Sequence, residues 1–374
     1  MTTQTTTLSR PLSLVDKLKQ DSVQDYISRL LWQKSTTAPF VVELDPTTAC
    51  NLACHDCISA NLLNQGGIPG ERLLALAREF ADNGVRAVVL IGGGEPMAHP
   101  MFSELVKSLH TSGIKVGVTT NGTLIDRHFD ACANMTSWLR VSVDAGSTEV
   151  FQEFRPHASG KSQFKLVIDN LERLARQSHG LVGYSFLLLS KYNPDGSLNC
   201  TNAVDIALAA RLAKDIGCDY FEVKPAFDMM HFLQHQDNSV VDTVNANLRA
   251  AHELASDTFK IIAPLTLDDA LSGITTQVKP YNRCLTAEMR TVISPSGVYV
   301  CPYHRGNLNM RIGDITKVSL TELWSSDQRK RVMDRLDPSR HCGFHCIRHE
   351  SNLLLERMAA GEMIDPVSDF DLFI

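Results

Sequence analysis

The sequence predicts an α/β fold: a partial (β/α)6 barrel of the TIM type, followed by a smaller α+β region built on a β-hairpin and a helix. Between residues 40 and about 230, short β-rich runs alternate with longer stretches of helical periodicity. This alternation is typical of a parallel sheet with helices on its outer face. After about residue 275 the alternation stops, which indicates a second architecture. Because six units are found, we expect an incomplete barrel rather than a closed one of eight units.

Each barrel strand is predicted from a short run of β-branched and apolar residues. The six runs cover residues 40–44, 87–91, 115–119, 139–143, 181–189 and 220–223. The helical patterns between them cover residues 71–81, 102–109, 164–176 and 202–216. The predicted parts of the chain are a polar segment with a helix (1–39), the barrel (40–275), the smaller region (276–352) and a tail (353–374).

The smaller region is predicted from a hairpin pattern and an amphipathic pattern. Residues 290–294 and 298–300 are β-rich and flank a Pro-Ser-Gly turn sequence. An amphipathic helix is expected from about 319 to 336, before a cysteine-rich stretch at 341–349. At the other end of the chain, a helix is expected over 13–33, packed against the barrel.

The composition narrows the class of partner. A net charge of −6 over 374 residues leaves no basic surface for nucleic acid. No apolar run approaches the roughly 18 residues that a membrane helix needs, and the first ten residues lack the apolar core of a signal peptide. We therefore expect a cytoplasmic protein that uses neither nucleic acid nor a membrane as partner. Its ten cysteines then indicate metal binding or redox chemistry rather than disulfides.

Three cysteines, Cys50, Cys54 and Cys57, are spaced C-x3-C-x2-C directly after the first strand. Three thiolates can hold three corners of a 4Fe–4S cluster and leave the fourth iron without a protein ligand. A metal with an open position performs chemistry, whereas a fully ligated metal is usually structural or carries electrons. Taken alone, this loop is equally compatible with a zinc site that lacks a ligand or a fragment of a ferredoxin-like site.

Further motifs stand at the ends of the next three strands: a glycine-rich run, an asparagine turn, and a hydroxyl with a carboxylate. In chain order the residues are Gly92, Gly93, Gly94, Glu95, Pro96, Asn121, Ser142 and Asp144. In a parallel barrel the carboxyl ends of the strands converge on one mouth. Glycines let the backbone approach a ligand closely, and a hydroxyl beside a carboxylate suits the hydroxyls of a ribose.

The cysteine loop, the GGGEP run and the fourth-strand motif together resemble the radical S-adenosylmethionine (radical SAM) superfamily over residues 40–230. The resemblance implies that the open iron of the cluster binds the amino and carboxylate groups of S-adenosylmethionine (SAM). It also implies reductive cleavage of SAM to a 5′-deoxyadenosyl radical that removes hydrogen from a substrate. A flavodoxin or ferredoxin is the electron donor expected for such an enzyme.

The same resemblance implies roles for the strand-end residues. The glycines and Glu95 would contact the methionine amino group, and Ser142 and Asp144 the ribose. Asn121 and Arg155 are assigned to the same cofactor site. One position departs from the family: Asp56 stands where an aromatic residue usually contacts the adenine, and His55 is the expected substitute.

A second group of cysteines, Cys284, Cys301, Cys342 and Cys346, brackets the hairpin and the amphipathic helix. Four thiolates close a tetrahedral zinc site or complete the ligation of a 4Fe–4S cluster. The arrangement resembles the twitch/SPASM extension of radical SAM enzymes, which implies an auxiliary 4Fe–4S cluster. Four histidines nearby are expected to surround this site rather than to bind the metal. They are His304, His341, His345 and His349.

The leading functional interpretation is a radical SAM oxidoreductase that acts on a small polar metabolite, such as a sugar, an aminocyclitol or a nucleoside. It rests on the roughly 39 residues before the first strand, which are too few for a peptide-recognition domain. The auxiliary cluster would handle the second electron, giving dehydrogenation or epimerisation. Cys218, the single spare thiol expected near the mouth, would then be a hydrogen donor.

Two alternatives remain open: a radical SAM maturase of peptides, and a non-catalytic redox sensor that holds iron–sulfur clusters or zinc. Polar residues on late strands and loops are the candidates for holding the substrate. They are Arg155, Lys191, Asn193, Lys224 and Arg305.

Overall fold

The protein is described by a computed structural model over residues 13–228, 232–234 and 237–374. Its centre is a ten-stranded sheet with the order β12-β11-β10-β1-β2-β3-β4-β5-β8-β9. The strands from β1 to β9 in this order run parallel to their neighbours and form the partial barrel that the sequence predicts. These strands are β1 (Val41–Leu44), β2 (Ala87–Leu90), β3 (Lys115–Thr120), β4 (Trp138–Ser142), β5 (Leu181–Leu188), β8 (Tyr220–Pro225) and β9 (Lys260–Ile262).

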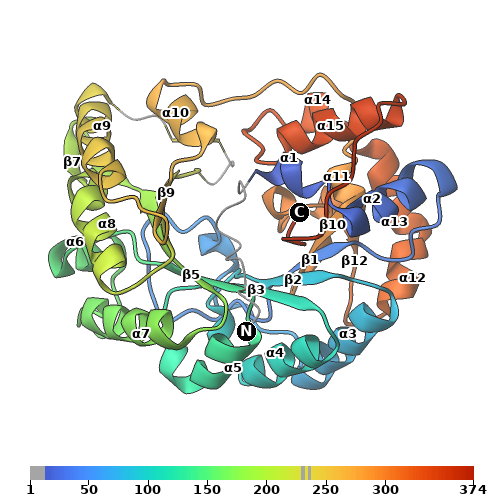
Figure 1. The fold of residues 1–374 in the computed structure, drawn as a ribbon, viewed down its shortest axis with the longest axis horizontal. Helices are drawn as coiled ribbons and strands as arrows, with labels where there is room; N and C mark the ends of the chain where they lie inside the picture. Colours follow the sequence, from blue (N-terminus) through green and yellow to red (C-terminus); the bar gives the residue numbers. More distant parts are fainter. Residues whose placement is uncertain (1–12, 229–231, 235–236) are drawn as a thin grey trace.

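Helices cover the outer face of this sheet, as Figure 1 shows. They are α3 (Gly70–Asp82), α4 (Phe102–Thr111), α5 (Phe129–Met135), α6 (Thr148–Phe154), α7 (Phe164–Gln177), α8 (Ile206–Asp215), α9 (Asn238–His252) and α10 (Leu265–Leu271). A small hairpin of β6 (Ser190–Tyr192) and β7 (Leu198–Thr201) follows β5. The apolar spacing of α3 illustrates why these helices form: Leu73, Leu76 and Phe80 are fully buried on one face.

The hairpin after the barrel extends the same sheet. It consists of β10 (Arg290–Ser294) and β11 (Gly297–Tyr299), and β12 (Arg311–Gly313) continues it. Because β10 pairs in parallel with β1, the predicted boundary near residue 275 separates elements that share one sheet. This pairing covers the open edge that β1 would otherwise expose. Sequence periodicity carries no information on a pairing between residues about 250 positions apart.

Two predicted helices are each broken into shorter elements. The pattern over 319–336 forms α12 (Leu320–Ser325) and α13 (Asp327–Arg335), because the side chain of Ser326 caps α13 through the N–H of Arg329. The pattern over 13–33 forms α1 (Leu14–Lys17), α2 (Asp21–Ser28) and a π-helical turn over Arg29–Gln33. The remaining helices are α11 (Thr286–Met289), α14 (Pro338–His341) and α15 (His349–Ala359). The predicted tail boundary at 353 therefore falls inside α15.

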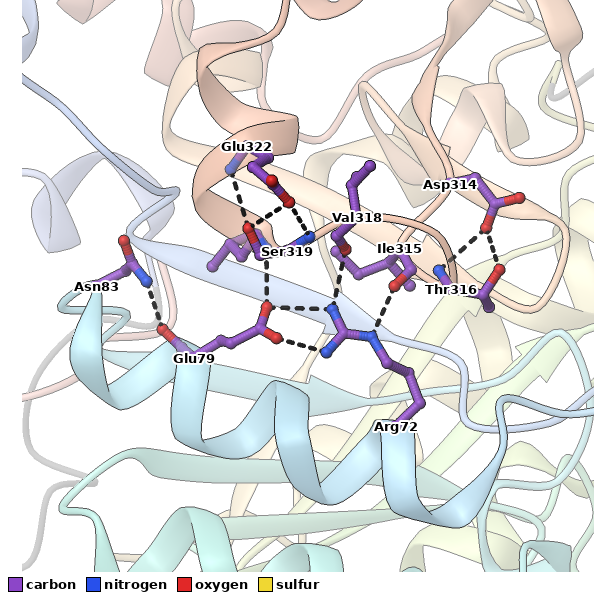
Figure 2. Close-up of polar contacts among 10 residues, drawn as sticks. Arg72, Glu79, Asn83, Asp314, Ile315, Thr316, Val318, Ser319 and Glu322 are labelled. Atoms are coloured by element: carbon purple, nitrogen blue, oxygen red, sulfur yellow. Dashed lines mark hydrogen bonds and ion pairs between the residues drawn. The ribbon is translucent and has the colours of Figure 1, made fainter.

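A polar clamp joins helix α3 of the barrel to α12 (Figure 2). The Arg72 guanidinium binds the Glu79 carboxylate and the carbonyl oxygens of Ile315 and Val318. Glu79 in turn accepts a hydrogen bond of 2.8 Å from the N–H of Leu320, in the first turn of α12. The clamp fixes the segment that follows β12 to the outside of the barrel.

The amino ends of the barrel strands are closed by a floor of apolar side chains. Trp138 lies over Gly117 of the neighbouring strand, where a side chain would collide with its ring, and Phe373 meets Trp138 edge to face at 5.3 Å. The last residues, 372–374, are buried in a cluster with α1, α2 and α15. Lys17 anchors them through an ion pair of 2.7 Å with Asp371. Within the described ranges, no helix is both long and apolar enough to cross a bilayer.

Candidate active site

The loop with Cys50, Cys54 and Cys57 follows β1 at the mouth of the barrel, and its three thiols are partly buried. Thr48 fixes the start of the loop, because its hydroxyl donates to the carbonyl of Gly66 and accepts from the N–H of Gln65. Burial raises the pKa of Cys50 to about 11. A bound cation such as iron would favour the thiolate form.

The glycine run packs directly against the cysteine loop. The N–H of Glu95 donates to the carbonyl of Ala49, next to Cys50, at 2.8 Å. A Cβ on Gly94 would stand 2.4 Å from that same carbonyl oxygen, so the approach is too close for any other residue. Gly93 has room for a Cβ, with its nearest neighbours at 3.5 Å. The run therefore holds the loop and leaves the backbone of Gly93 less crowded.

The side chain of Glu95 faces inward, and its expected contact with the methionine amino group stays a prediction. One carboxylate oxygen accepts from Thr120 at 2.7 Å and from the N–H of Met97, and the other accepts from the N–H of Asn121 at 2.7 Å. The residue is 2% exposed. Glu95 thus ties the end of β2 to the end of β3, and Pro96 begins the short 3-10 helix that follows.

Asn121 reaches the cysteine loop from the end of β3. Its side-chain amide donates to Asn51 at 2.9 Å and lies 4.0 Å from the sulfur of Cys50. The side-chain oxygen Oδ1 of Asn121 accepts a hydrogen bond from the hydroxyl of Thr123. The sequence prediction that Asn121 lies in the site therefore agrees with its place in the structure.

Asp144 has a left-handed backbone (φ 58°) and a buried carboxylate. One oxygen accepts from the N–H of Leu187 at 2.7 Å, and the other binds Arg155. A terminal nitrogen of Arg155 lies 3.8 Å from the sulfur of Cys54. Burial alone would lower the pKa of Arg155, but the charge of the Asp144 carboxylate outweighs this effect and raises that pKa. Asp144 therefore positions Arg155 beside the cysteines, while Ser142 lies half-buried at the end of β4.

The second cysteine group lies where β10, β11 and α15 meet. Asn352 donates to the sulfur of Cys284 at 3.7 Å, the N–H of Arg348 points at Cys346 at 3.4 Å, and His304 lies 3.7 Å from Cys342. Burial raises the pKa of Cys301, Cys342 and Cys346, and the charge of neighbouring thiols of the group raises it further, with Cys284 contributing to all three.

A buried ammonium accompanies this second group. Lys279 is 3% exposed and donates to the carbonyls of Gln277 and Phe344. Cys342 and Cys346 are close enough to favour its charged form, against the burial that lowers its pKa. Among the described residues, no three His, Cys, Asp or Glu side chains converge in the way that a single metal ion requires.

The prediction that Cys218 supplies hydrogen at the mouth is wrong. Cys218 precedes β8, and the amino ends of parallel strands lie at the floor, opposite the mouth. Its thiol is 4% exposed in the main apolar core, and burial raises its pKa. Of the polar substrate candidates, Lys191 pairs with Glu153 beside the β6–β7 hairpin, whereas Arg305 and Lys224 pair with carboxylates of the barrel.

Three interior charges were missed by the sequence analysis: Asp45, Arg140 and Glu222. Asp45 is fully buried after β1 and pairs with Arg305 at 2.6 Å, while burial raises its pKa to about 6. Arg140 and Glu222 stand in the middle of strands, at positions that alternate with buried apolar residues. The sequence did hold a signal for Arg140 and Glu222. Each is a charged residue in a strand whose neighbouring positions are apolar, so its side chain points to the opposite face of the sheet.

Comparison with known proteins supports the same class. Residues 44–195 match the model of the radical SAM superfamily. The chain is 26% identical over 318 residues to the mycofactocin maturase MftC of Mycobacterium ulcerans (strain Agy99), covering 82% of this chain and 80% of that protein. It is 26% identical over 286 residues to MftC of Mycobacterium tuberculosis (strain H37Rv), covering 73% of this chain and 66% of that protein.

Solved structures agree on the fold. Streptococcus suis SuiB bound to S-adenosylmethionine aligns with a TM-score of 0.62 at 14% identity, over 93% of this chain and 80% of that one. The structure of anSMEcpe with bound AdoMet aligns with a TM-score of 0.56 at 15% identity, over 87% of this chain and all of that one. Residues 44–195 therefore form a radical SAM domain, and the radical SAM superfamily uses SAM and a 4Fe–4S cluster, as the sequence predicted.

Proposed function

We infer that this radical SAM enzyme is a peptide maturase, which modifies a residue of a precursor peptide. The observation that carries the proposal is the match to a maturase, MftC, along 82% of this chain and 80% of the relative. It replaces the small-metabolite interpretation, which rested on the short segment before β1. The length of that segment says nothing about where along the barrel a peptide binds.

The residues at the mouth fit the cluster that the superfamily implies. Cys50, Cys54 and Cys57 would hold three irons, with N–H donors of Asn121 and Arg155 directed at two of the sulfurs. When bound, the cluster and SAM supply a 5′-deoxyadenosyl radical that removes a hydrogen atom from the substrate. Arg155 brings a fixed positive charge beside thiolates, and the tightly packed Gly94 holds the loop at the mouth.

The second cysteine group would hold an auxiliary 4Fe–4S cluster with Cys284, Cys301, Cys342 and Cys346 as ligands. Such a cluster, when bound, would accept or donate single electrons. The ammonium group of Lys279 is buried beside this cysteine group. Its positive charge is balanced when the cysteines are thiolates, as they are in a cluster. Replacing Cys342 and Cys346 by Ala should remove about four irons per chain. It should block product formation without stopping 5′-deoxyadenosine formation; normal product would contradict a role in turnover.

The proposed function is tested with short peptides encoded beside the gene. Reconstituted protein, SAM and dithionite are incubated without oxygen with each peptide, and products are followed by mass spectrometry. A changed peptide mass, formed together with 5′-deoxyadenosine, supports the maturase. Deuterium transferred from one peptide position into 5′-deoxyadenosine would identify the modified residue. Turnover of sugars, aminocyclitols or nucleosides, with all peptides unchanged, would contradict the proposal.

A further inference from the structure

The interior of the barrel carries a group of charges between the floor and the mouth. On β4 and β8, Leu139, Val141, Phe221 and Val223 are fully buried in the apolar core that also includes the outer helices. Arg140, Glu222 and Lys224 alternate with them and face the other side, the barrel interior. Their side chains keep 24%, 16% and 26% exposure, so they are partly accessible and not sealed in the apolar core.

The strand between β4 and β8 permits these side chains to meet. Arg140 is paired with Gly183 of β5, and Glu222 is paired with Ser185 of β5. The ring of Tyr220 lies over Gly183, where a Cβ would stand 2.0 Å from it. Arg140 reaches Glu222 across β5, and its Nη1 donates to Glu222 Oε2 at 3.0 Å. The Nζ of Lys224 lies 3.3 Å from the same oxygen.

One carboxylate is therefore shared by two cations. The other ion pairs near the mouth, Arg155 with Asp144 and Arg305 with Asp45, each match one cation to one carboxylate. Arg140 also has a buried Nε without a hydrogen-bond partner. Burial and then the charge of Arg140 lower the pKa of Lys224, against the opposing effect of Glu222. A purely structural link between β4 and β8 needs only one of these cations, and the second one leaves the group with one more cation than carboxylates.

We propose that Arg140 and Lys224 form a subsite for a carboxylate of the substrate. With the proposed function, that carboxylate belongs to the peptide, as an acidic side chain or as its C-terminal carboxyl group. A single excess positive charge matches a monoanion, and a guanidinium beside an ammonium provides several charge-assisted hydrogen bonds. Lys224 stands near the carboxyl end of β8, and the carboxyl ends of parallel strands converge on the mouth, where Asp144 holds Arg155 beside Cys54. The bound group therefore faces the same mouth as the cysteine loop.

The experiment compares kcat/KM for an accepted peptide and for its neutralised forms. In one form each Asp or Glu becomes Asn or Gln, and in the other the C-terminus is amidated. We expect one of these changes to lower kcat/KM by about tenfold or more with the wild-type enzyme, as for loss of a charged hydrogen bond. In Lys224→Met, the kcat/KM of the acidic peptide divided by that of the neutral peptide should fall several-fold towards one. Because this ratio does not depend on the folded fraction, partial unfolding of the variant does not obscure it.

Lys165→Met is the matched control, since Lys165 forms an exposed pair with Asp169 outside the barrel and should keep the wild-type ratio. A wild-type enzyme indifferent to both neutralisations, or an unchanged ratio in Lys224→Met, would overturn the subsite. Absence of turnover with every peptide would instead contradict the maturase function, so the two failures are distinct. The neutralised peptide whose kcat/KM falls shows whether the side-chain or the C-terminal carboxylate is bound.

Discussion

Gly94→Ala tests whether the glycine run holds the cysteine loop in place. The added methyl group would stand 2.4 Å from the carbonyl oxygen of Ala49, 2.5 Å from the carbonyl carbon of Thr48 and 2.6 Å from the oxygen of Thr48. These are backbone atoms, so no side-chain rotation relieves the contact. Since Cβ contacts below 3.0 Å essentially do not occur, one segment must move by about 0.6 Å or more.

The expected cost follows from this overlap. Overpacking of this kind lowers the free energy of unfolding by about 1–3 kcal/mol. The displaced segment leads directly into Cys50, and the hydrogen bond from the N–H of Glu95 to Ala49 is strained with it. We therefore expect Gly94→Ala to lose iron from the first cysteine group, which would lower the iron content per chain towards half.

Gly93→Ala is the matched control, because its Cβ would meet Asp45 and Thr48 at an ordinary 3.5 Å. The assay is iron and sulfide content after anaerobic reconstitution and gel filtration, together with urea unfolding of both variants. Turnover is left out of this comparison, since a methyl group on Gly93 would also face the cofactor in the expected arrangement. Equal iron content and equal stability of the two variants would contradict a role of Gly94 in holding the cysteine loop.

Three further predictions concern stability, each measured by urea unfolding. Glu79→Gln weakens the clamp on α12 and should cost about 1–2 kcal/mol, whereas Asp169→Asn in an exposed ion pair should cost under about 0.5; equal costs would contradict the clamp. Deleting residues 372–374 removes three buried side chains and should cost at least about 4 kcal/mol, and a loss below about 1 would contradict their role in the floor. The pKa of Asp45 is about 6 in the folded protein and about 4 in the unfolded chain, so the folded state binds this proton more tightly. The resulting stabilisation is complete below about pH 4 and is lost as the pH rises through 6. Wild type should therefore gain up to about 3 kcal/mol relative to Asp45→Asn between pH 7 and pH 4, and parallel pH profiles would contradict this.

The barrel was predictable because its strands and helices carry local signals. The runs at 87–91 and 115–119 agree with β2 and β3 to within one residue, and the helical pattern at 164–176 agrees with α7. The three-residue strand β9 and the pairing of β10 with β1 were missed, since neither leaves a local pattern.

The candidate site was predictable where a motif fixes residue type and spacing. The motif-based prediction assigned Asn121 and Arg155 to the cofactor site, and in the structure these residues lie beside Cys50 and Cys54. It did not reveal that the carboxylate of Glu95 is directed into the protein, because residue spacing says nothing of the hydrogen bonds that hold it there. It also misplaced Cys218, because it assigned the start of a strand to the mouth when only strand ends lie there.

The most direct test of the account is the response of the first cluster to SAM. In oxygen-free, dithionite-reduced protein, SAM should change the electron paramagnetic resonance spectrum of that cluster and be converted to methionine and 5′-deoxyadenosine. Both effects should vanish when Cys50, Cys54 and Cys57 are replaced by Ala and persist in Cys132→Ala, whose thiol is buried in the core. An unchanged spectrum and no 5′-deoxyadenosine from the wild-type protein would contradict an open iron at the barrel mouth.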